Sequence, residues 1–120
     1  MPAVKPRLYG IPNCDTVKRA RAWFAARGVD VDFVDYKKTP PTRALIEGWL
    51  AHVDTDALVN RSGTTWRKLG DAERASADKR AGAVALMVAN PSLIRRPVIE
   101  YGGALLVGFD AARYARTFHG

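Results

Sequence analysis

The sequence predicts one α/β domain with a β-α-β half, a group of helices and a β-β-α half. Three patterns support this prediction: an amphipathic stretch between two short runs of β-compatible residues, apolar residues at helical spacing in the middle of the chain, and a glycine pair between two short apolar runs near its end. The 120 residues are 48% hydrophobic and 26% charged, which excludes a disordered, collagen-like or repeat-built chain. We expect a single domain over residues 1–120, with a helical insertion over approximately residues 40–92.

The first half is predicted to be strand, turn, helix and strand. Residues 7–11 form a short strand, and an amphipathic helix follows over residues 17–27, with Asp15 and Thr16 as N-cap types before it. Residues 29–36 alternate apolar and acidic side chains, which is the periodicity of a strand. Two short parallel strands joined by a helix imply a right-handed crossover. The buried face of the helix is expected to contain Val17, Ala20, Trp23 and Phe24.

The middle of the chain is predicted to be helical. An apolar stripe between residues 40 and 53 indicates one helix, and a short helix capped by Thr64 or Thr65 follows a glycine-containing turn. A third helix is expected over residues 78–89, ended by an Asn-Pro pair.

The last third returns to strands. Residues 97–101 and 104–107 flank Gly102 and Gly103, which predicts a β-hairpin with a two-glycine turn. Asp110 can cap a final helix that runs to residue 118. The resulting sheet has four strands and mixes parallel with antiparallel pairing.

The charge balance is basic, with 19 Lys and Arg against 12 Asp and Glu, a formal net charge of +7. Such a surplus suggests an anionic partner. However, acidic residues interleave with the basic ones, no run of five like charges occurs, and no nucleic-acid motif is present. We therefore do not expect nucleic-acid binding, and a small anion explains local arginine pairs as well.

One cysteine and two histidines limit the chemistry further. A single Cys excludes an internal disulfide and a Cys-rich zinc site, and no metal site is expected. The first ten residues lack the apolar region of a secretory signal, and the longest apolar run, residues 83–89, is too short for a membrane span. We expect a cytoplasmic protein whose thiol stays reduced.

Cys14 is the main candidate for chemistry. A lone Cys is most often a small buried hydrophobe, but Cys14 lies in the polar turn Pro-Asn-Cys-Asp-Thr at the start of a predicted helix. Unpaired backbone N–H groups and the partial positive charge there favour the thiolate. Lys18 and Arg19 add positive potential, whereas Asp15 opposes it. Because Val17 stands where a Cys-x-x-Cys pair has its second thiol, a disulfide cycle needs an external thiol such as glutathione.

Two arginines are candidate anion ligands. Arg61 lies in a tight turn, and Arg96 directly precedes a predicted strand that opens with Pro97. A guanidinium at such a position can hold a planar or tetrahedral anion with two hydrogen bonds. The alternative is a solvated surface arginine, and the residues alone leave both interpretations open.

Four blocks resemble one known family. These blocks, which span residues 9–110, are YGIPNCDTVKRA, NRSGTTWRKL, NPSLIRRPVIE and VGFD. In this order and spacing they are similar to the arsenate reductase (ArsC) family, and within it to the Spx/YffB branch. The resemblance implies a thioredoxin-like fold interrupted by a helical insertion, and a cis Arg96–Pro97 bond that faces the active-site Cys.

The resemblance also implies roles for single residues. Cys14 matches the catalytic Cys of the family, and Arg61 and Arg96 match two arginines that hold the oxyanion in arsenate reductases. The third arginine of those enzymes is absent, because this chain has Gly108 near that position. Loss of one preorganised charge contact can cost ~10²–10³ in rate. Further candidates for the anion site are the neighbours of Cys14, namely Asn13, Asp15, Thr16 and Lys18. The alternatives are that Thr16 is only a cap and Lys18 only a solvated charge.

Two classes of function follow. The first is a glutathione-dependent thiol reductase with no bound cofactor, with glutathione and glutaredoxin as candidate partners and a small anionic or disulfide substrate. Arsenate reduction is the alternative reaction within this class. The second is a non-enzymatic, Spx-like regulator that binds RNA polymerase, although the absence of a second Cys counts against a redox switch.

Overall fold

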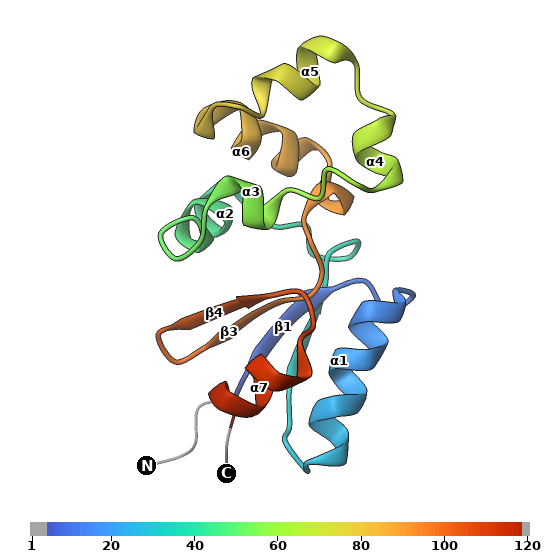
Figure 1. Cartoon of the computed structure of the whole chain (residues 1–120), viewed down its shortest axis with the longest axis vertical. Helices are drawn as coiled ribbons and strands as arrows, with labels where there is room; N and C mark the ends of the chain where they lie inside the picture. Colours follow the sequence, from blue (N-terminus) through green and yellow to red (C-terminus); the bar gives the residue numbers. More distant parts are fainter. Residues whose placement is uncertain (1–4, 119–120) are drawn as a thin grey trace. The chain divides into compact units, whose positions relative to one another are not determined.

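The computed structural model describes residues 5–118, which form two compact units (Figure 1). The first unit combines the chain up to Asp35 with the chain from Arg96 onward, and the second is the segment Tyr36–Arg95. Residues 1–4, on which part of the expectation about a secretory signal falls, and residues 119–120 lie outside the described chain. The helical unit has nearly the bounds of the expected insertion, and the single domain stays a prediction.

The first unit contains a four-stranded mixed sheet. Its strand order is β2-β1-β3-β4, with β1 parallel to β2 and antiparallel to β3, and β3 antiparallel to β4. The predicted fold class is therefore confirmed. The elements are β1 (Arg7–Gly10), α1 (Asp15–Ala26), β2 (Asp32–Asp35), β3 (Val98–Tyr101), β4 (Ala104–Val107) and α7 (Ala111–Thr117).

Helices α1 and α7 share one hydrophobic core with the sheet. The four residues predicted for the buried face of α1 are all buried, and Trp23 meets Tyr114 of α7 edge to face with 5.4 Å between ring centroids. Edge-to-face aromatic pairs add about 0.5–1.5 kcal/mol to the burial of their area. This core fixes the start of α1 against the sheet. Its buried members are Leu8, Val17, Ala20, Trp23, Phe24, Ile99, Leu106, Tyr114 and Phe118.

The second unit is helical. Helix α6 is apolar for most of its length and packs against α2, α5 and η1, while Val59 and Ile94 form an isolated β-bridge. Five α-helices and one 3₁₀ helix lie within residues 36–95: α2 (Arg43–Trp49), α3 (Thr55–Leu58), α4 (Thr64–Arg67), α5 (Asp71–Ser76), α6 (Arg80–Ala89) and η1 (Pro91–Leu93).

Several boundaries differ from the prediction for local reasons. Strand β2 begins at Asp32 instead of residue 29, because the amides of Gly28 and Val29 close the end of α1 by donating to the carbonyls of Ala25 and Phe24. Gly28 has a φ of 67°, the left-handed conformation that this C-terminal motif requires. Helices α3 and α5 were not predicted, since four and six residues carry too little periodicity.

The predicted N-caps of two helices are wrong. Helix α1 begins at Asp15 with Cys14 as its N-cap, and α4 begins at Thr64 with Gly63 as its N-cap. By contrast, the carboxylate of Asp110 accepts a hydrogen bond from the amide of Arg113 at 3.1 Å, which confirms that cap. The hairpin between β3 and β4 is also confirmed.

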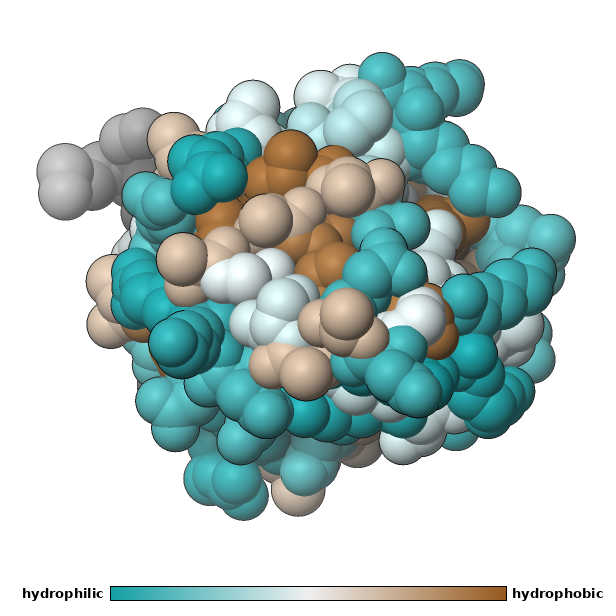
Figure 2. Space-filling view, turned by 90° about the horizontal axis from the view of Figure 1, so that it is seen from above, coloured by the Kyte–Doolittle hydropathy of each residue, from teal (hydrophilic) through white to brown (hydrophobic). Residues whose placement is uncertain are grey.

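Val88 is the one large hydrophobic side chain within residues 5–118 that is exposed. On the face in Figure 2, hydrophilic residues surround a smaller group of hydrophobic ones. Within residues 5–118, no helix is both long enough and apolar enough to cross a membrane.

Candidate functional site around Cys14

Cys14 occupies the junction between β1 and α1. Its backbone is extended, with φ −129° and ψ 125°, and its carbonyl accepts the first helical hydrogen bond from the amide of Lys18 at 2.9 Å. The side chain is half-buried and packs against the edge of the core. As the N-cap, Cys14 lies where the first N–H groups of α1 have no helical partner.

The surroundings of the thiol favour its ionised form. Partial burial raises the pKa of Cys14, but hydrogen bonds from the Val17 amide, the Arg96 side chain and the Thr16 amide outweigh burial, and the positive charge of Arg96 adds to them. The net result is a pKa below the ordinary value of a thiol. The thiolate is the nucleophilic form of cysteine, so this site can carry out nucleophilic sulfur chemistry.

The segment that carries Arg96 is fixed to the sheet. The Arg96–Pro97 peptide bond is cis, as the resemblance implied, and the Pro97 carbonyl accepts a hydrogen bond from the Gly108 amide at 2.8 Å. The Gly108 carbonyl in turn accepts one from the buried Tyr114 hydroxyl at 2.6 Å. Gly108 has a φ of 81°, a conformation that residues with a side chain rarely adopt. The backbone itself thus favours glycine where the third arginine of arsenate reductases is expected.

The predicted neighbours of Cys14 contribute unequally. Thr16 is half-buried and lies within α1, so it is not the helix cap, and its amide faces the thiol. The side chains of Asn13, Asp15 and Lys18 are exposed. Their role in binding an anion stays a prediction.

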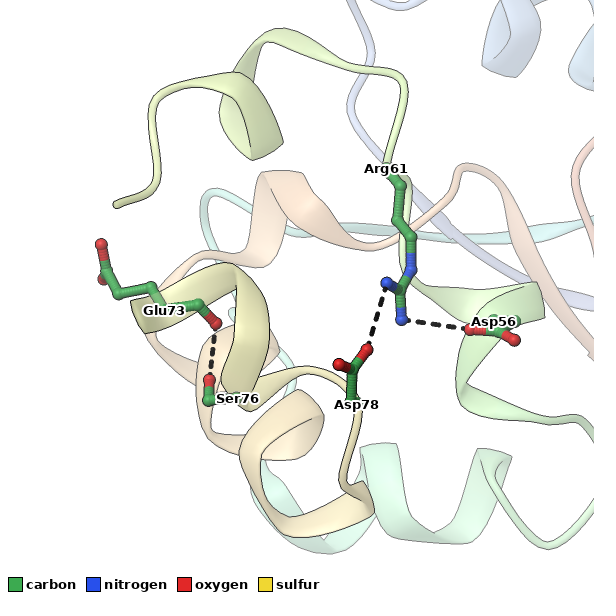
Figure 3. Close-up of polar contacts among 5 residues, drawn as sticks. All are labelled: Asp56, Arg61, Glu73, Ser76 and Asp78. Carbon is green, nitrogen blue, oxygen red and sulfur yellow. Dashed lines mark hydrogen bonds and ion pairs between the residues drawn. The ribbon is translucent and has the colours of Figure 1, made fainter. Parts of the chain in front are cut away.

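Arg61 belongs to the helical unit and is held there by two carboxylates. Its guanidinium lies 3.1 Å from an Asp56 oxygen and 3.7 Å from an Asp78 oxygen (Figure 3). Its central carbon lies 5.0 Å from the ring centroid of Trp66. These contacts bring two exposed carboxylates to its guanidinium, and its predicted role in substrate binding stays a prediction.

Three residues around Cys14 and Arg61 were not singled out by the sequence analysis. The Val17 amide is a donor to the thiol, whereas the sequence drew attention to Val17 only as the missing second Cys. The carboxylates of Asp56 and Asp78 hold Arg61, and no local motif indicated them. Within residues 5–118, no group of three or more His, Cys, Asp or Glu residues lies together as a metal site would need.

Comparison with known proteins decides the family. The model of the ArsC family matches residues 9–117. The chain belongs to the ArsC family. Among solved structures, it is 45% identical to a protein named YffB, with a TM-score of 0.89 and 93% of this chain and 97% of that chain covered. An arsenate reductase (ArsC) related protein from Brucella melitensis is 41% identical, with a TM-score of 0.77 and 99% and 98% covered.

Curated ArsC relatives differ in their described roles. An uncharacterized protein of Haemophilus influenzae is 37% identical over 92% of this chain and 96% of its own length. The global transcriptional regulator Spx of Streptococcus pyogenes is 28% identical over 86% of this chain and 77% of its own length. An arsenate reductase of Rhizobium meliloti is also 28% identical, over 77% of this chain and 66% of its own length. The relatives of this chain therefore include both an arsenate reductase and a regulator.

Proposed function

We propose that this ArsC-family protein is a thiol-dependent reductase in which Cys14 is the nucleophile and glutathione the co-substrate. The observation that carries the proposal is the set of donors around Cys14: the amides of Thr16 and Val17 and the side chain of Arg96 lower the pKa of its thiol. A structural cysteine in an apolar core would have a raised pKa instead.

The proposed cycle starts from a mixed disulfide between glutathione and another thiol. The Cys14 thiolate attacks the glutathione sulfur, the original S–S bond breaks, and the other thiol leaves and takes up a proton. A second glutathione, as its thiolate, then attacks the glutathione sulfur on Cys14 and leaves as oxidised glutathione, which regenerates the Cys14 thiolate. The net reaction converts one mixed disulfide and one glutathione into one free thiol and oxidised glutathione.

This one-cysteine cycle follows from the composition of the chain. The 120 residues contain a single Cys, so the second thiol has to come from another molecule. The Arg96 guanidinium is placed to stabilise the thiolate and, in the proposal, also meets a carboxylate of glutathione or another anionic group of the substrate. Glutaredoxin is the alternative source of the second thiol.

Glutathionylation of Cys14 tests the proposal. Reduced protein is mixed with oxidised glutathione at neutral pH, and the mixed disulfide is followed by intact mass, with the urea-unfolded chain as the reference thiol. We expect the folded protein to react faster than the unfolded one, and Cys14→Ser to show neither the adduct nor reductase activity in a glutathione-coupled assay. Slower reaction of the folded protein, or full activity of Cys14→Ser, contradicts the proposal.

A regulatory role is the second candidate, supported by the 28% identity to Spx over 86% of the chain. In this alternative the protein docks on RNA polymerase and needs no turnover. A pull-down with purified RNA polymerase distinguishes the two, because Cys14→Ser should keep the interaction if binding alone is the function. Arsenate reduction is the third candidate. Gly108 counts against it, because it lies near the position of the third arginine of arsenate reductases. An arsenate assay with glutathione and glutaredoxin tests this candidate directly.

A further inference from the structure

Helix α1 carries its charges in an order that does not suit its dipole. The N-terminal end of a helix is positive, so acidic residues stabilise the first turn and basic residues stabilise the last. Asp15 is the acidic residue of α1, whereas Lys18, Arg19 and Arg21 follow it closely and the last turn holds no basic residue. The dipole of α1 therefore gives no reason for a lysine at position 18.

Lys18 lies one helical turn after Cys14. Its amide donates to the Cys14 carbonyl at 2.9 Å, and residues four apart share one side of a helix. The Cα–Cβ bonds of a helix tilt toward its N-terminus, so the Lys18 side chain leans toward the end that holds the thiol. Four residues rise about 6 Å along the axis, which is less than the screening length of about 8 Å at physiological salt. The charge of Lys18 therefore acts on a molecule that approaches Cys14.

Lys18 differs from Arg96 in how its charge is used. The Arg96 side chain is half-buried and hydrogen-bonds to the thiol, so its charge and that of the thiolate offset each other for an approaching anion. The Lys18 side chain is exposed, and it forms no ion pair within residues 5–118. Asp15 has two basic neighbours on the helix surface, Lys18 and Arg19, three and four residues later. The exposed start of α1 therefore keeps a net positive charge.

This charge specifies the class of molecule that reacts best at Cys14. The thiolate repels an anionic disulfide, and a net positive charge beside the thiolate opposes that repulsion. A neutral disulfide gains no attraction from Lys18, and a cationic disulfide is repelled by it. The favoured partner is a disulfide that carries a carboxylate near its sulfur atoms, since a carboxylate can pair with an exposed ammonium group.

We propose that Lys18 makes Cys14 selective for anionic disulfides, by pairing with a carboxylate of the incoming molecule while Arg96 remains on the sulfur. The inference rests on the proposed function, because it requires Cys14 to attack a disulfide. In that step the Cys14 thiolate forms a bond to one sulfur of the disulfide, the S–S bond breaks, and the other half leaves as a thiolate that takes up a proton from water. Lys18 exchanges neither electrons nor a proton, so its role is specificity.

Three small symmetrical disulfides of different charge test this selectivity. They are oxidised glutathione, which is anionic, hydroxyethyl disulfide, which is neutral, and cystamine, which is cationic. Rate constants for formation of the Cys14 adduct are measured by intact mass at neutral pH, in low and in high salt. We expect Lys18→Gln to slow the reaction with oxidised glutathione about 5-fold, the factor that corresponds to the roughly 1 kcal/mol between unit charges about 4 Å apart in water. The neutral disulfide should change by less than about 2-fold, and cystamine should react faster. High salt should reduce the preference of the wild type for oxidised glutathione over the neutral disulfide.

Two control variants separate the charge at this position from charge elsewhere. Lys18→Arg keeps the charge and should keep the selectivity, whereas Arg113→Gln removes one exposed charge from α7 of the same unit and should not change it. Circular dichroism confirms that the variants fold. Equal slowing of all three disulfides by Lys18→Gln would mean that the lysine acts on the thiol instead of the substrate, and the inference would be wrong. Unchanged ratios among the three rate constants would also overturn it. If none of the three disulfides reacts with the wild type, the proposed function itself fails.

Discussion

Replacement of Gly82 by alanine should destabilise the protein, although alanine is the better helix former. Gly82 lies in the first turn of α6, and a Cβ atom built there would meet the backbone carbonyl oxygen of Ser76 at 1.9 Å. Alanine in place of glycine gains about 1 kcal/mol in a helix, while overpacking costs about 1–3 kcal/mol and occasionally more. Because the atom that would be struck belongs to the backbone, we expect the upper end of that cost and a net loss of about 2 kcal/mol.

Gly48→Ala is the matched control. Gly48 lies in α2, is exposed, and has no atom within 4 Å of the added Cβ. The same chemical change there should stabilise the protein by about 0.5–1 kcal/mol. The two substitutions should therefore change the free energy of unfolding in opposite directions, because only the Cβ added at Gly82 would collide with the backbone of Ser76.

Thermal and urea unfolding measure both variants by circular dichroism. At this chain length about 1 kcal/mol corresponds to roughly 3–6 °C in Tm, so Gly82→Ala should lower Tm by about 6–12 °C and Gly48→Ala should raise it by a few degrees. Displacement of Ser76 would also disturb the ion pair between Arg61 and Asp78, which lies two residues after Ser76 (Figure 3). If Gly82→Ala is as stable as the wild type, the close approach of α5 and α6 is wrong.

Four further outcomes can be measured. Arg96→Ala should slow the reaction of Cys14 with oxidised glutathione at neutral pH about 3- to 10-fold, because it removes a charged hydrogen bond between half-exposed groups. It should also move the pH-rate profile to higher pH. The control Arg95→Ala, at an exposed neighbouring position, should change neither the rate nor the profile. Folding lowers the pKa of Cys14, so the wild type should gain stability over Cys14→Ser as the pH rises from the folded pKa toward the usual ~8.5. That gain should be lost as the pH falls through the folded pKa. Urea titrations of both proteins at several pH values check this. Gly108→Ala should cost about 1–2 kcal/mol in the free energy of unfolding, because φ is 81° there; a cost near zero would refute the assigned conformation. Tyr114→Phe should cost about 1 kcal/mol, since it removes the hydrogen bond to the Gly108 carbonyl, and an unchanged urea midpoint would contradict that bond.

Elements with strong local signals were predictable from the sequence. The hairpin depended on Gly102 and Gly103, the cap of α7 on Asp110, and the buried face of α1 on residues at helical spacing. In each case the deciding interaction lies within a few residues along the chain. Cys14 could be identified for the same reason, because a polar turn before a helix start is a local pattern.

What escaped prediction depends on distant contacts or on the backbone. From the sequence, Arg61 could be either an anion ligand or a solvated surface arginine. Its contact with the carboxylate of Asp78, 17 positions further along the chain, could not be predicted from the local sequence. The sequence indicated that the first N–H groups of the helix favour the thiolate, but not that the Val17 amide is one of the donors, since every residue except proline has such a group. The start of β2 was misplaced because the amide of Val29 closes α1, an interaction that alternating side chains do not reveal.

The distribution of the three tryptophans gives each compact unit its own optical reporter. Trp23 lies in the core of the first unit, whereas Trp49 and Trp66 belong to the helical unit. The Arg27 guanidinium stacks 3.9 Å from the centroid of the Trp23 ring, so the emission of this indole should respond when the end of α1 frays. A variant that retains Trp23 alone and one that lacks only Trp23 would let fluorescence follow the two units separately during urea unfolding. Coincident transitions would mean that the unit containing Cys14 and the helical unit lose their structure in one cooperative event.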